Sequence, residues 1–307
     1  MLLSYLEFAV RIGVDLGGTK IEVVALDDAR NELFRKRVAT PRECYQQTLG
    51  VISQLVSETE VYLGQKGTVG VGIPGTVSSV SGKVKNANST WINGECLHYD
   101  LSDRLQREIR VANDANCMAL SESIDGSAKG QGVVFAAILG TGCGAGIAIN
   151  SRVHSGINEV AGEWGHNPLP WLNHGDEPPL ECYCGRVNCL ETWVSGTGFS
   201  QSYQRRTGKA LSAECIIENV GQGEFEAIAE LELYEHRLAR GLAQVINTLD
   251  PDVIVLGGGM SNVDSLYQAL PVQLSEWVFG GECSTPVVKA MHGDSSGVRG
   301  AAFLWGF

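Results

Sequence analysis

Basic residues are scarce in this sequence. Of 307 residues, 23 are lysine or arginine and 35 are aspartate or glutamate, so the formal net charge is −12. Nucleic-acid-binding domains usually carry a basic patch or stripe, so we expect no nucleic acid among the partners. A phosphate ligand stays compatible with this charge, because backbone N–H groups and a bound divalent cation hold phosphates locally.

Long apolar runs are also lacking. No stretch of about 18 apolar residues occurs, so the sequence predicts no transmembrane helix and no membrane partner. The opening MLLSYLEFAV lacks the basic start and the small-residue cleavage site of a signal peptide, and we interpret it as an extension or a lead-in to the first strand. The nine cysteines, an odd number, favour free thiols and metal ligands over disulfides. We therefore expect a cytoplasmic protein.

Low-complexity sequence is missing as well. Hydrophobic residues make up 44% of the chain and charged residues 19%, which is ordinary for a folded protein. The length suffices for two moderate domains. The 38 glycines gather in short groups, which indicates tight turns close to a ligand and not a flexible linker.

Alternating strands and helices predict an α/β fold. In the first half we expect strands at Val10–Asp15, Ile21–Leu26, Leu33–Val38, Thr68–Ile73 and Ile109–Ala112, and helices at Cys44–Leu63, Leu101–Glu108 and from Asn113 or Asp114 to about Ile124. In the second half we expect strands at Val133–Leu139, Gly146–Asn150 and Val253–Leu256, and helices at Glu224–Leu249 and Gly297–Phe303. Each half begins with a strand, a glycine turn and a strand. This pattern predicts two similar domains with a ligand cleft between them and a hinge near residues 117–130.

The first glycine turn has the sequence Asp15-Leu16-Gly17-Gly18-Thr19-Lys20. Glycines let the backbone approach phosphate oxygens, Thr19 and Lys20 offer a hydroxyl and a charge, and Asp15 can hold Mg²⁺ directly or through water. A plain hairpin turn with a charged exit is the alternative. No GxxxxGK[ST] match occurs here, so this is not a Walker A loop.

The second glycine turn is Gly140-Thr141-Gly142-Cys143-Gly144-Ala145-Gly146. Its loose GxGxxA match resembles a dinucleotide-binding loop, but that loop requires a helix to follow. The next residues, IAIN, predict a strand, so we expect a second phosphate-binding hairpin instead. A third group, Gly257–Gly259, follows a buried strand and either lies beside a nucleotide base or ribose or simply turns the chain.

A set of sulfur and imidazole side chains predicts a metal site. His166, Cys182, Cys184 and Cys189 form a Cys₃His set, which suits a tetrahedral, structural Zn²⁺. Buried reduced cysteines are the alternative, but the close C-x-C-x₄-C spacing argues against it. An iron–sulfur cluster is disfavoured because no fourth cysteine lies nearby. With all four ligands used, a catalytic zinc that activates water is not expected.

Three carboxylates accompany these loops. Asp114 follows a strand in VANDAN, where it either faces the cleft or caps the next helix. Glu163 lies three residues before His166, and Glu191 lies two after Cys189, so the metal site would hold both in place. Tethered in this way, the two glutamates could accept hydrogen bonds from sugar hydroxyls.

Taken together, these motifs resemble those of the ROK sugar kinases. The matching segments, from about Arg11 to near the end, are DLGGTK, GVGIPG, VANDANC, ILGTGCGAG, GEWGH, CYCGRVNCLE, VIVLGGG and HGDSSGVRGAA. Within the family, NANSTWING and GEWGHNPLPW look most like bacterial fructokinases of the manno(fructo)kinase type, with N-acetylglucosamine kinases the nearest competitors. One departure is Asn188, where the family usually has glycine; asparagine tolerates a left-handed backbone, so the zinc site is still expected.

The resemblance implies a fold of two ribonuclease-H-like domains, as in the actin, hexokinase and Hsp70 superfamily, that close on ATP and a sugar. The domains would span residues 1–117 and 118–295, with the closing helix 296–307 returning to the first. Asp114 would be the general base, and Asn113, Glu163, His166 and Glu191 would join it in binding the sugar. The groups expected to hold ATP and Mg²⁺ are Gly13, Asp15, Gly17, Gly18, Thr19, Lys20, Gly140, Thr141, Gly142, Gly144, Gly146 and Gly258. A homodimer is implied too.

The expected activity is phosphoryl transfer from ATP to a hexose, with fructose to fructose 6-phosphate as the main prediction. N-acetylglucosamine, mannose and glucose are the alternative acceptors. A sugar-responsive repressor of the same family would carry a helix-turn-helix segment, and only about ten residues precede the first expected strand. A noncatalytic sugar-binding protein is disfavoured by Asp114 and by both phosphate turns.

Overall fold

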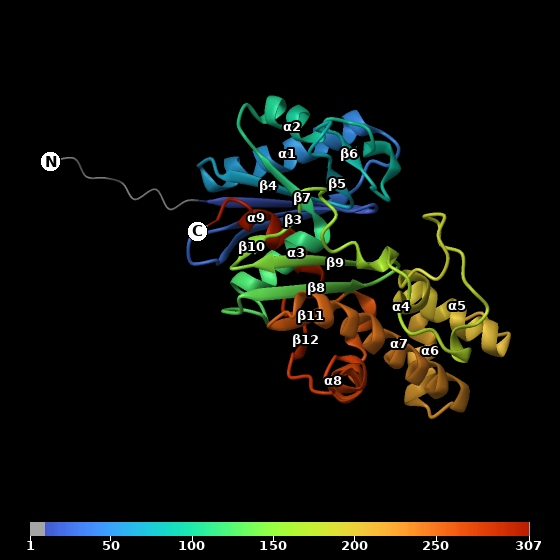
Figure 1. The fold of residues 1–307 in the computed structure, drawn as a ribbon. Coiled ribbons are helices and arrows are strands. Elements are labelled where there is room, and N and C mark those ends of the chain that lie inside the picture. The colour runs from blue at the N-terminus through green and yellow to red at the C-terminus, as the bar shows by residue number, and fades with distance from the viewer. Residues whose placement is uncertain (1–9, 307) are drawn as a thin grey trace.

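The computed structural model describes residues 10–306 (Figure 1). The expected N-terminal extension therefore lies outside the described residues, apart from its last residue, Val10. Within the described part of the chain, no helix is long and apolar enough to cross a membrane.

The first sheet has the strand order β3-β2-β1-β4-β7. Its strands are β1 (Arg11–Leu16), β2 (Lys20–Leu26), β3 (Glu32–Ala39), β4 (Thr68–Ile73) and β7 (Arg110–Asn113). The chain runs antiparallel through β1, β2 and β3, whereas β4 is parallel to both β1 and β7. All residues of β1 but one are buried, because helices cover both faces of this sheet.

Helices α1 (Tyr45–Leu63) and α2 (Leu97–Leu105) lie on one face of the first sheet (Figure 1). Helix α1 ends where the sequence predicts, because Gly64 adopts the left-handed conformation of a helix C-cap, with φ of 69°. Helix α2 begins and ends earlier than the expected Leu101–Glu108. A small hairpin of β5 (Thr76–Val77) and β6 (Val84–Lys85) lies beside these helices.

The second sheet repeats the plan of the first, with the order β10-β9-β8-β11-β12. Its strands are β8 (Val133–Leu139), β9 (Cys143–Ile149), β10 (Arg152–Val153), β11 (Val253–Gly257) and β12 (Val287–Lys289). Again an antiparallel hairpin leads into parallel neighbours, here β8, β11 and β12. The shared topology confirms the predicted pair of ribonuclease-H-like halves, which the weak identity between the two glycine turns could not prove.

Two helices lie between the sheets, α3 (Asp114–Ile124) and α9 (Ser296–Phe303). Helix α9 contacts β1, β2 and β4, while α3 contacts β8, β9 and α9 itself. The two helices pack so closely that α9 needs a glycine at position 300, since a Cβ there would lie 1.7 Å from the carbonyl oxygen of Cys117 in α3. The last helix thus packs on the first sheet. The domain bounds and the hinge remain predictions.

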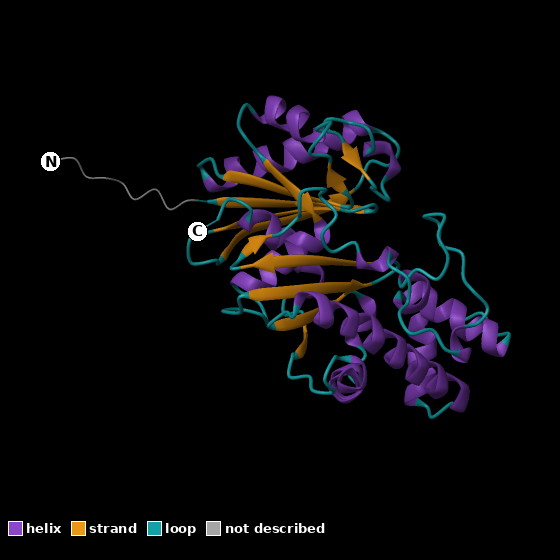
Figure 2. Ribbon diagram, viewed as in Figure 1, coloured by secondary structure: helices purple, strands orange, loops and turns teal. Residues whose placement is uncertain are grey.

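The remaining helices belong to the second half and extend to one side of its sheet (Figure 2). They are α4 (Glu191–Val194), α5 (Gly196–Thr207), α6 (Ala213–Gly221), α7 (Phe225–Leu249) and α8 (Leu266–Trp277). Their apolar faces and the second sheet share one core, which includes Phe135, Trp193 and Leu238. Long connections also contain 3₁₀ turns at Thr90–Ile92, Trp164–His166, His174–Asp176, Gly259–Asn262 and Gly293–Ser295.

Candidate active site and metal cluster

The junction of β7 and α3 places the expected base. Asn113 is the N-cap of α3: its side-chain oxygen accepts hydrogen bonds from the backbone N–H groups of Ala115 (2.9 Å) and Asn116 (3.3 Å). Its amide nitrogen donates to the carbonyl oxygen of Gly75 at 3.2 Å. Asp114 is the first helical residue and accepts from the N–H of Ala115 at 2.8 Å. The cap role therefore falls to Asn113, which positions Asp114 at the start of the helix.

Carboxylates converge around Asp114. Burial raises the pKa of Asp114 to about 6, and the negative charge of Glu163 contributes. Burial also raises the pKa of Asp15, to about 7, with Asp114 and Glu22 adding to the effect. Behind them, burial raises the pKa of the Cys117 thiol well above its usual range. Glu163 comes from the second half of the chain and the two aspartates from the first, and the raised pKa values of Asp15 and Asp114 are typical of functional sites.

The first glycine turn is a tight hairpin between β1 and β2. The N–H of Gly17 donates to the carbonyl oxygen of Lys20 at 3.0 Å, and the Thr40 hydroxyl donates to the carbonyl oxygen of Gly17 at 2.7 Å. The ammonium of Lys20 lies 3.8 Å from Asp294, near the start of α9. Gly13 is different: it lies within β1, and a Cβ there would stand 2.1 Å from the carbonyl oxygen of Val298. Packing against α9 thus explains the glycine at this position, not the expected phosphate contact.

The second glycine turn is shorter than expected. It spans residues 140–142, and the N–H of Gly140 donates to the carbonyl oxygen of Gly142 at 3.0 Å. Gly144 and Gly146 lie in β9, beyond the turn. A Cβ on Gly146 would stand 2.1 Å from the carbonyl oxygen of Ala115, so this glycine serves the packing of β9 against α3. The sequence analysis assigned Gly144 and Gly146 to the phosphate turn, because nothing in GTGCGAG marks where the strand begins.

Gly258 packs directly against the backbone at the start of this turn. It has a φ of 80°, and a Cβ there would lie 2.6 Å from the backbone of Leu139. Gly258 thus lets the chain after β11 pass close behind the second turn. Glu191 approaches the same turn, where its carboxylate accepts from the N–H of Cys143 at 2.9 Å. Glu191 therefore links the metal-ligand segment to the second glycine turn.

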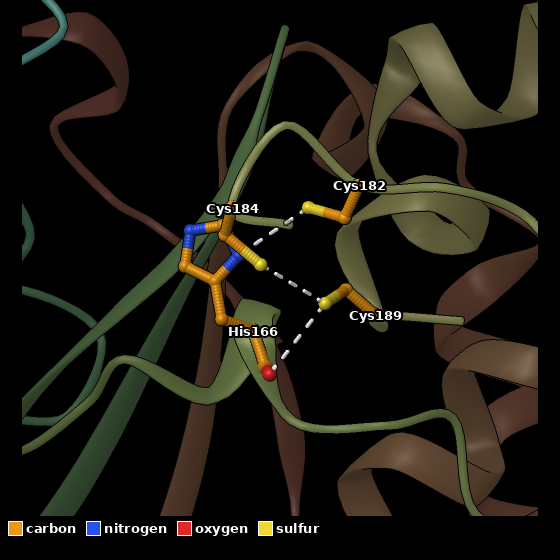
Figure 3. Close-up of side chains that lie close together, drawn as sticks. All are labelled: His166, Cys182, Cys184 and Cys189. Atoms are coloured by element: carbon orange, nitrogen blue, oxygen red, sulfur yellow. Dashed lines mark hydrogen bonds between the residues drawn. The ribbon is translucent and has the colours of Figure 1, made fainter. Parts of the chain in front are cut away.

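The four expected metal ligands form one cluster (Figure 3). The ligand atoms of His166, Cys182, Cys184 and Cys189 all lie within 4.8 Å of one another. Cys184 Sγ lies 3.5 Å from Cys189 Sγ, and Cys182 Sγ lies 3.6 Å from His166 Nδ1. Zn–S bonds of about 2.3 Å and a Zn–N bond of about 2.0 Å imply tetrahedral edges of roughly 3.5–3.8 Å. The cluster therefore fits the size and the donor set of a structural zinc site.

The connection between His166 and Cys182 is fixed by a buried ion-pair network that the sequence did not reveal. Asp176 meets Arg237 at 3.0 Å and Arg240 at 2.8 Å, both from the long helix α7. Asn188, the departure from the family pattern, has a φ of 57°, as the sequence argument requires. Its side chain also accepts from the N–H of Leu180 at 2.8 Å, which closes the loop beside the cysteines.

Two cavities adjoin these groups. The first measures about 1130 Å³ and takes its walls from both halves; its lining includes Asn86, Asn88, Glu163, His166 and Tyr183. The second measures about 640 Å³ and lies beside the second glycine turn; its lining includes Gly140, Thr141, Thr197, Ser212 and Gly259.

Of the expected sugar ligands, only Glu163 and His166 line the first cavity; Asn113, Asp114 and Glu191 do not. The sequence missed most of the second cavity, because helices α5 and α6 have no motif that marks a ligand.

Comparison with known proteins fixes the family. Residues 11–306 match the profile of the ROK family. The chain belongs to this family. It is 41% identical to the N-acetyl-D-glucosamine kinase of Pectobacterium atrosepticum, over 95% of the chain and 97% of that protein. Identity to the N-acetyl-D-glucosamine kinase of Pasteurella multocida is 42%, over 96% and 99%.

Solved structures agree with this ROK assignment. The ROK hexokinase of Thermus thermophilus superimposes with a TM-score of 0.85 at 26% identity, over 96% of this chain and 97% of that one. A ROK glucokinase of Streptomyces griseus, solved with glucose and AMPPNP, gives a TM-score of 0.78 at 26% identity, over 96% and 99%. The predicted ROK sugar kinase and its actin, hexokinase and Hsp70 type of fold are therefore confirmed.

Proposed function

We propose that this ROK protein transfers the γ-phosphoryl group of ATP to a hydroxyl of N-acetyl-D-glucosamine. The choice of acceptor rests on one observation. The chain is 41–42% identical in sequence, over at least 95% of its length, to N-acetyl-D-glucosamine kinases of two bacteria. These relatives favour the alternative of the sequence analysis over its main prediction, fructose. Fructose, mannose and glucose remain acceptors that the test must include.

The first cavity supports a role in binding the sugar. Glu163 offers hydrogen-bonding oxygens from the second half, and Asn86 and Asn88 offer amide groups from the first. Asp114 lies close enough to Glu163 for the two charges to interact. We place the reacting hydroxyl beside Asp114, with Asn113 orienting the base through the start of α3.

The transfer needs positioning and charge stabilisation more than covalent chemistry from the protein. The Asp114 carboxylate accepts the proton of the acceptor hydroxyl as that oxygen attacks the γ-phosphorus. The bond from this phosphorus to the β,γ-bridging oxygen breaks, and ADP leaves. We propose that the two glycine turns, at residues 17–20 and 140–142, hold phosphate oxygens through backbone N–H groups other than those of Gly17 and Gly140, which close the turns. Asp15 would hold Mg²⁺, which supplies positive charge to the phosphates when bound.

The second cavity fits the nucleotide end of ATP. Thr197 and Ser212 offer hydroxyls there, and Gly259 exposes its backbone next to the second turn. The sequence analysis left open whether the glycine group at 257–259 lies near the base or ribose or simply turns the chain. In the structure Gly259 lines the cavity, whereas Gly258 packs on the backbone of Leu139.

Zinc is the metal we propose for the Cys₃His cluster. Soft thiolates with one imidazole favour Zn²⁺, and four protein ligands leave no open position, so the role is structural. Elemental analysis of the purified protein by mass spectrometry should give about one zinc per chain. The homodimer also stays a prediction, which light scattering in solution tests.

An ADP-release assay with ATP, Mg²⁺ and a panel of four sugars tests the acceptor. The expected result is the highest kcat/KM with N-acetyl-D-glucosamine among that sugar, fructose, mannose and glucose. Preference for fructose would restore the main prediction of the sequence analysis and overturn the acceptor proposed here. No turnover of any sugar, by folded and metal-loaded protein, would overturn the kinase itself.

A further inference from the structure

Both ring nitrogens of His166 are engaged. Nδ1 lies 3.6 Å from the Cys182 sulfur, inside the metal cluster. Nε2 lies 3.0 Å from the hydroxyl of Tyr183, and the two rings meet edge-on, with centroids 5.2 Å apart. The nitrogen that faces away from the metal is therefore in contact with a tyrosine, at the corner where the sequence analysis expects a sugar hydroxyl.

The cluster fixes the direction of this hydrogen bond. A metal-bound histidine uses the lone pair of one nitrogen for the metal and donates the proton of the other. With a metal bound at Nδ1, the proton would reside on Nε2 and would be donated to the Tyr183 oxygen. A phenol is protonated at neutral pH and both accepts and donates. Since the Tyr183 oxygen accepts from His166, its own O–H is left to donate elsewhere.

Tyr183 presents this donor to the first cavity. It lines the cavity with Glu163 and His166, and 84% of its surface is exposed, so the protein leaves the ring free to meet a ligand. The volume of about 1130 Å³ lies above the range of roughly 300–1,000 Å³ common for ligand pockets, so substituents on a hexose ring have room. Apolar side chains of Ile147 and Val160 line the same cavity and suit a methyl group.

We propose that the Tyr183 hydroxyl donates a hydrogen bond to the carbonyl oxygen of the sugar's 2-acetamido group and so selects 2-acetamido hexoses over hexoses with a free 2-hydroxyl. An amide carbonyl only accepts, so it matches a group whose accepting capacity is used by His166. A 2-hydroxyl also accepts, but its oxygen is bonded directly to C2, whereas the acetamido carbonyl oxygen lies two bonds further out. A donor within reach of that carbonyl is therefore too far from a 2-hydroxyl to bond it. This inference rests on the proposed function and assigns its specificity to a residue between two metal ligands.

The test replaces Tyr183 by phenylalanine, which keeps the ring and removes only the hydroxyl. Tyr62→Phe is the matched control, because Tyr62 is also largely exposed, at 69%, and lies on α1. For wild type and both variants, kcat/KM is measured with N-acetyl-D-glucosamine and with glucose. Zinc content and calorimetric binding of N-acetyl-D-glucosamine without ATP complete the set.

Tyr183→Phe should lower kcat/KM and affinity for N-acetyl-D-glucosamine about 2–12-fold, the effect of one hydrogen bond. Its kcat/KM for glucose and its zinc content should stay at wild-type levels, and Tyr62→Phe should change neither sugar. An equal loss for both sugars would overturn the proposal and reduce Tyr183 to a residue that positions His166. Unchanged affinity for N-acetyl-D-glucosamine would overturn it as well.

Failure of the proposed function is recognised separately. If wild-type protein turns over another sugar but not N-acetyl-D-glucosamine, the acceptor is wrong. The calorimetric comparison still decides the role of Tyr183, since it needs binding and no turnover: wild type that binds N-acetyl-D-glucosamine more tightly than the variant supports the contact, and equal binding or none overturns it.

Discussion

At the scale of single residues, Asp114 is the proposed general base. Asp114→Asn retains an oxygen that can accept from the N–H of Ala115, so we expect the variant to fold and to bind sugar with wild-type affinity. Loss of the base should lower kcat about 10²–10⁴-fold. The base acts as a carboxylate, so kcat/KM of the wild type should fall as the pH drops below about 6, the pKa of Asp114. Steady-state kinetics between pH 5 and 8 test this, and near-wild-type turnover in the variant would remove Asp114 from the base role.

Asp15 illustrates a conflict between stability and function. Its pKa of about 7 in the folded protein lies above the ordinary value of 3.8, so the folded state binds more protons than the unfolded state between these pH values. The free energy of unfolding therefore falls as the pH rises through this window, and above pH 7 the full penalty of a buried charge is present. Asp15→Asn should raise the Tm of the ligand-free, cation-free protein at pH 8, with little gain at pH 4, while kinase activity is lost.

Asp27→Asn serves as a control of opposite sign. Its hydrogen bond with Asn31 holds the pKa of the Asp27 carboxyl below its usual value, so the charged form is the favoured one in the folded state. Removing that charge should not raise Tm at pH 8. An equal Tm gain in both variants would show that general charge repulsion, and not burial of Asp15, is responsible.

At the scale of elements, close helix packing accounts for glycines that look like ligand contacts. Gly146→Ala would drive a Cβ to within 2.1 Å of the Ala115 carbonyl oxygen, between β9 and α3. We expect a loss of about 1–3 kcal/mol in the free energy of unfolding, as for other overpacked sites. Catalysis should suffer too, because α3 carries Asp114.

Gly144→Ala is the matched control for this element. Gly144 lies two residues earlier in the same strand, and a Cβ there would meet nothing within 4 Å. Its stability should stay within about 0.5 kcal/mol of the wild type. Urea unfolding followed by tryptophan fluorescence measures both variants, and equal stability would mean that β9 and α3 move apart at no cost.

Helices and strands whose own residues show both a periodic apolar pattern and a clear end were predicted from the sequence. Helix α1 has a regular apolar pattern and a C-cap at Gly64, and β8 has the expected bounds, Val133–Leu139. Helix α8 was not predicted, because Pro271 inside it removes a backbone donor and argues against a helix. Helix α5 begins with Gly196 and contains Gly198. Both residues favour a turn over a helix, so this helix was not predicted either.

Contacts between distant residues limited the prediction of the site. The motifs identified the Cys₃His cluster, because its donor types and short spacing are themselves the chemistry. The network of Asp176 with Arg237 and Arg240 joins residues more than 60 positions apart, and no pattern in the sequence pairs them. Tyr183 was passed over for a related reason: only the folded loop brings its hydroxyl to His166.

At the scale of the whole molecule, both proposed ligand sites bridge the two halves. The first cavity, the proposed sugar site, is lined by Asn86 and Asn88 of the first half and by Glu163 and His166 of the second. The proposed phosphate site likewise uses one turn from each half, at residues 17–20 and 140–142. The two halves are already in contact, since the Lys85 ammonium of the first half donates to the carbonyl oxygen of Asn158 in the second at 3.0 Å. Either ligand should therefore favour the same closed arrangement.

Binding of the two ligands should consequently be cooperative. The first ligand to bind bears the free energy of bringing the halves together, and the second then binds to a protein that is already closed. Alone at 100 times its Kd, either N-acetyl-D-glucosamine or an unreactive ATP analogue with Mg²⁺ should stabilise the fold by about 2.7 kcal/mol. Together they should raise Tm by more than the sum of the separate shifts, corresponding to a coupling of about 1–3 kcal/mol. Thermal unfolding with neither, each and both ligands measures this, and shifts that merely add would mean that the two sites form independently of closure.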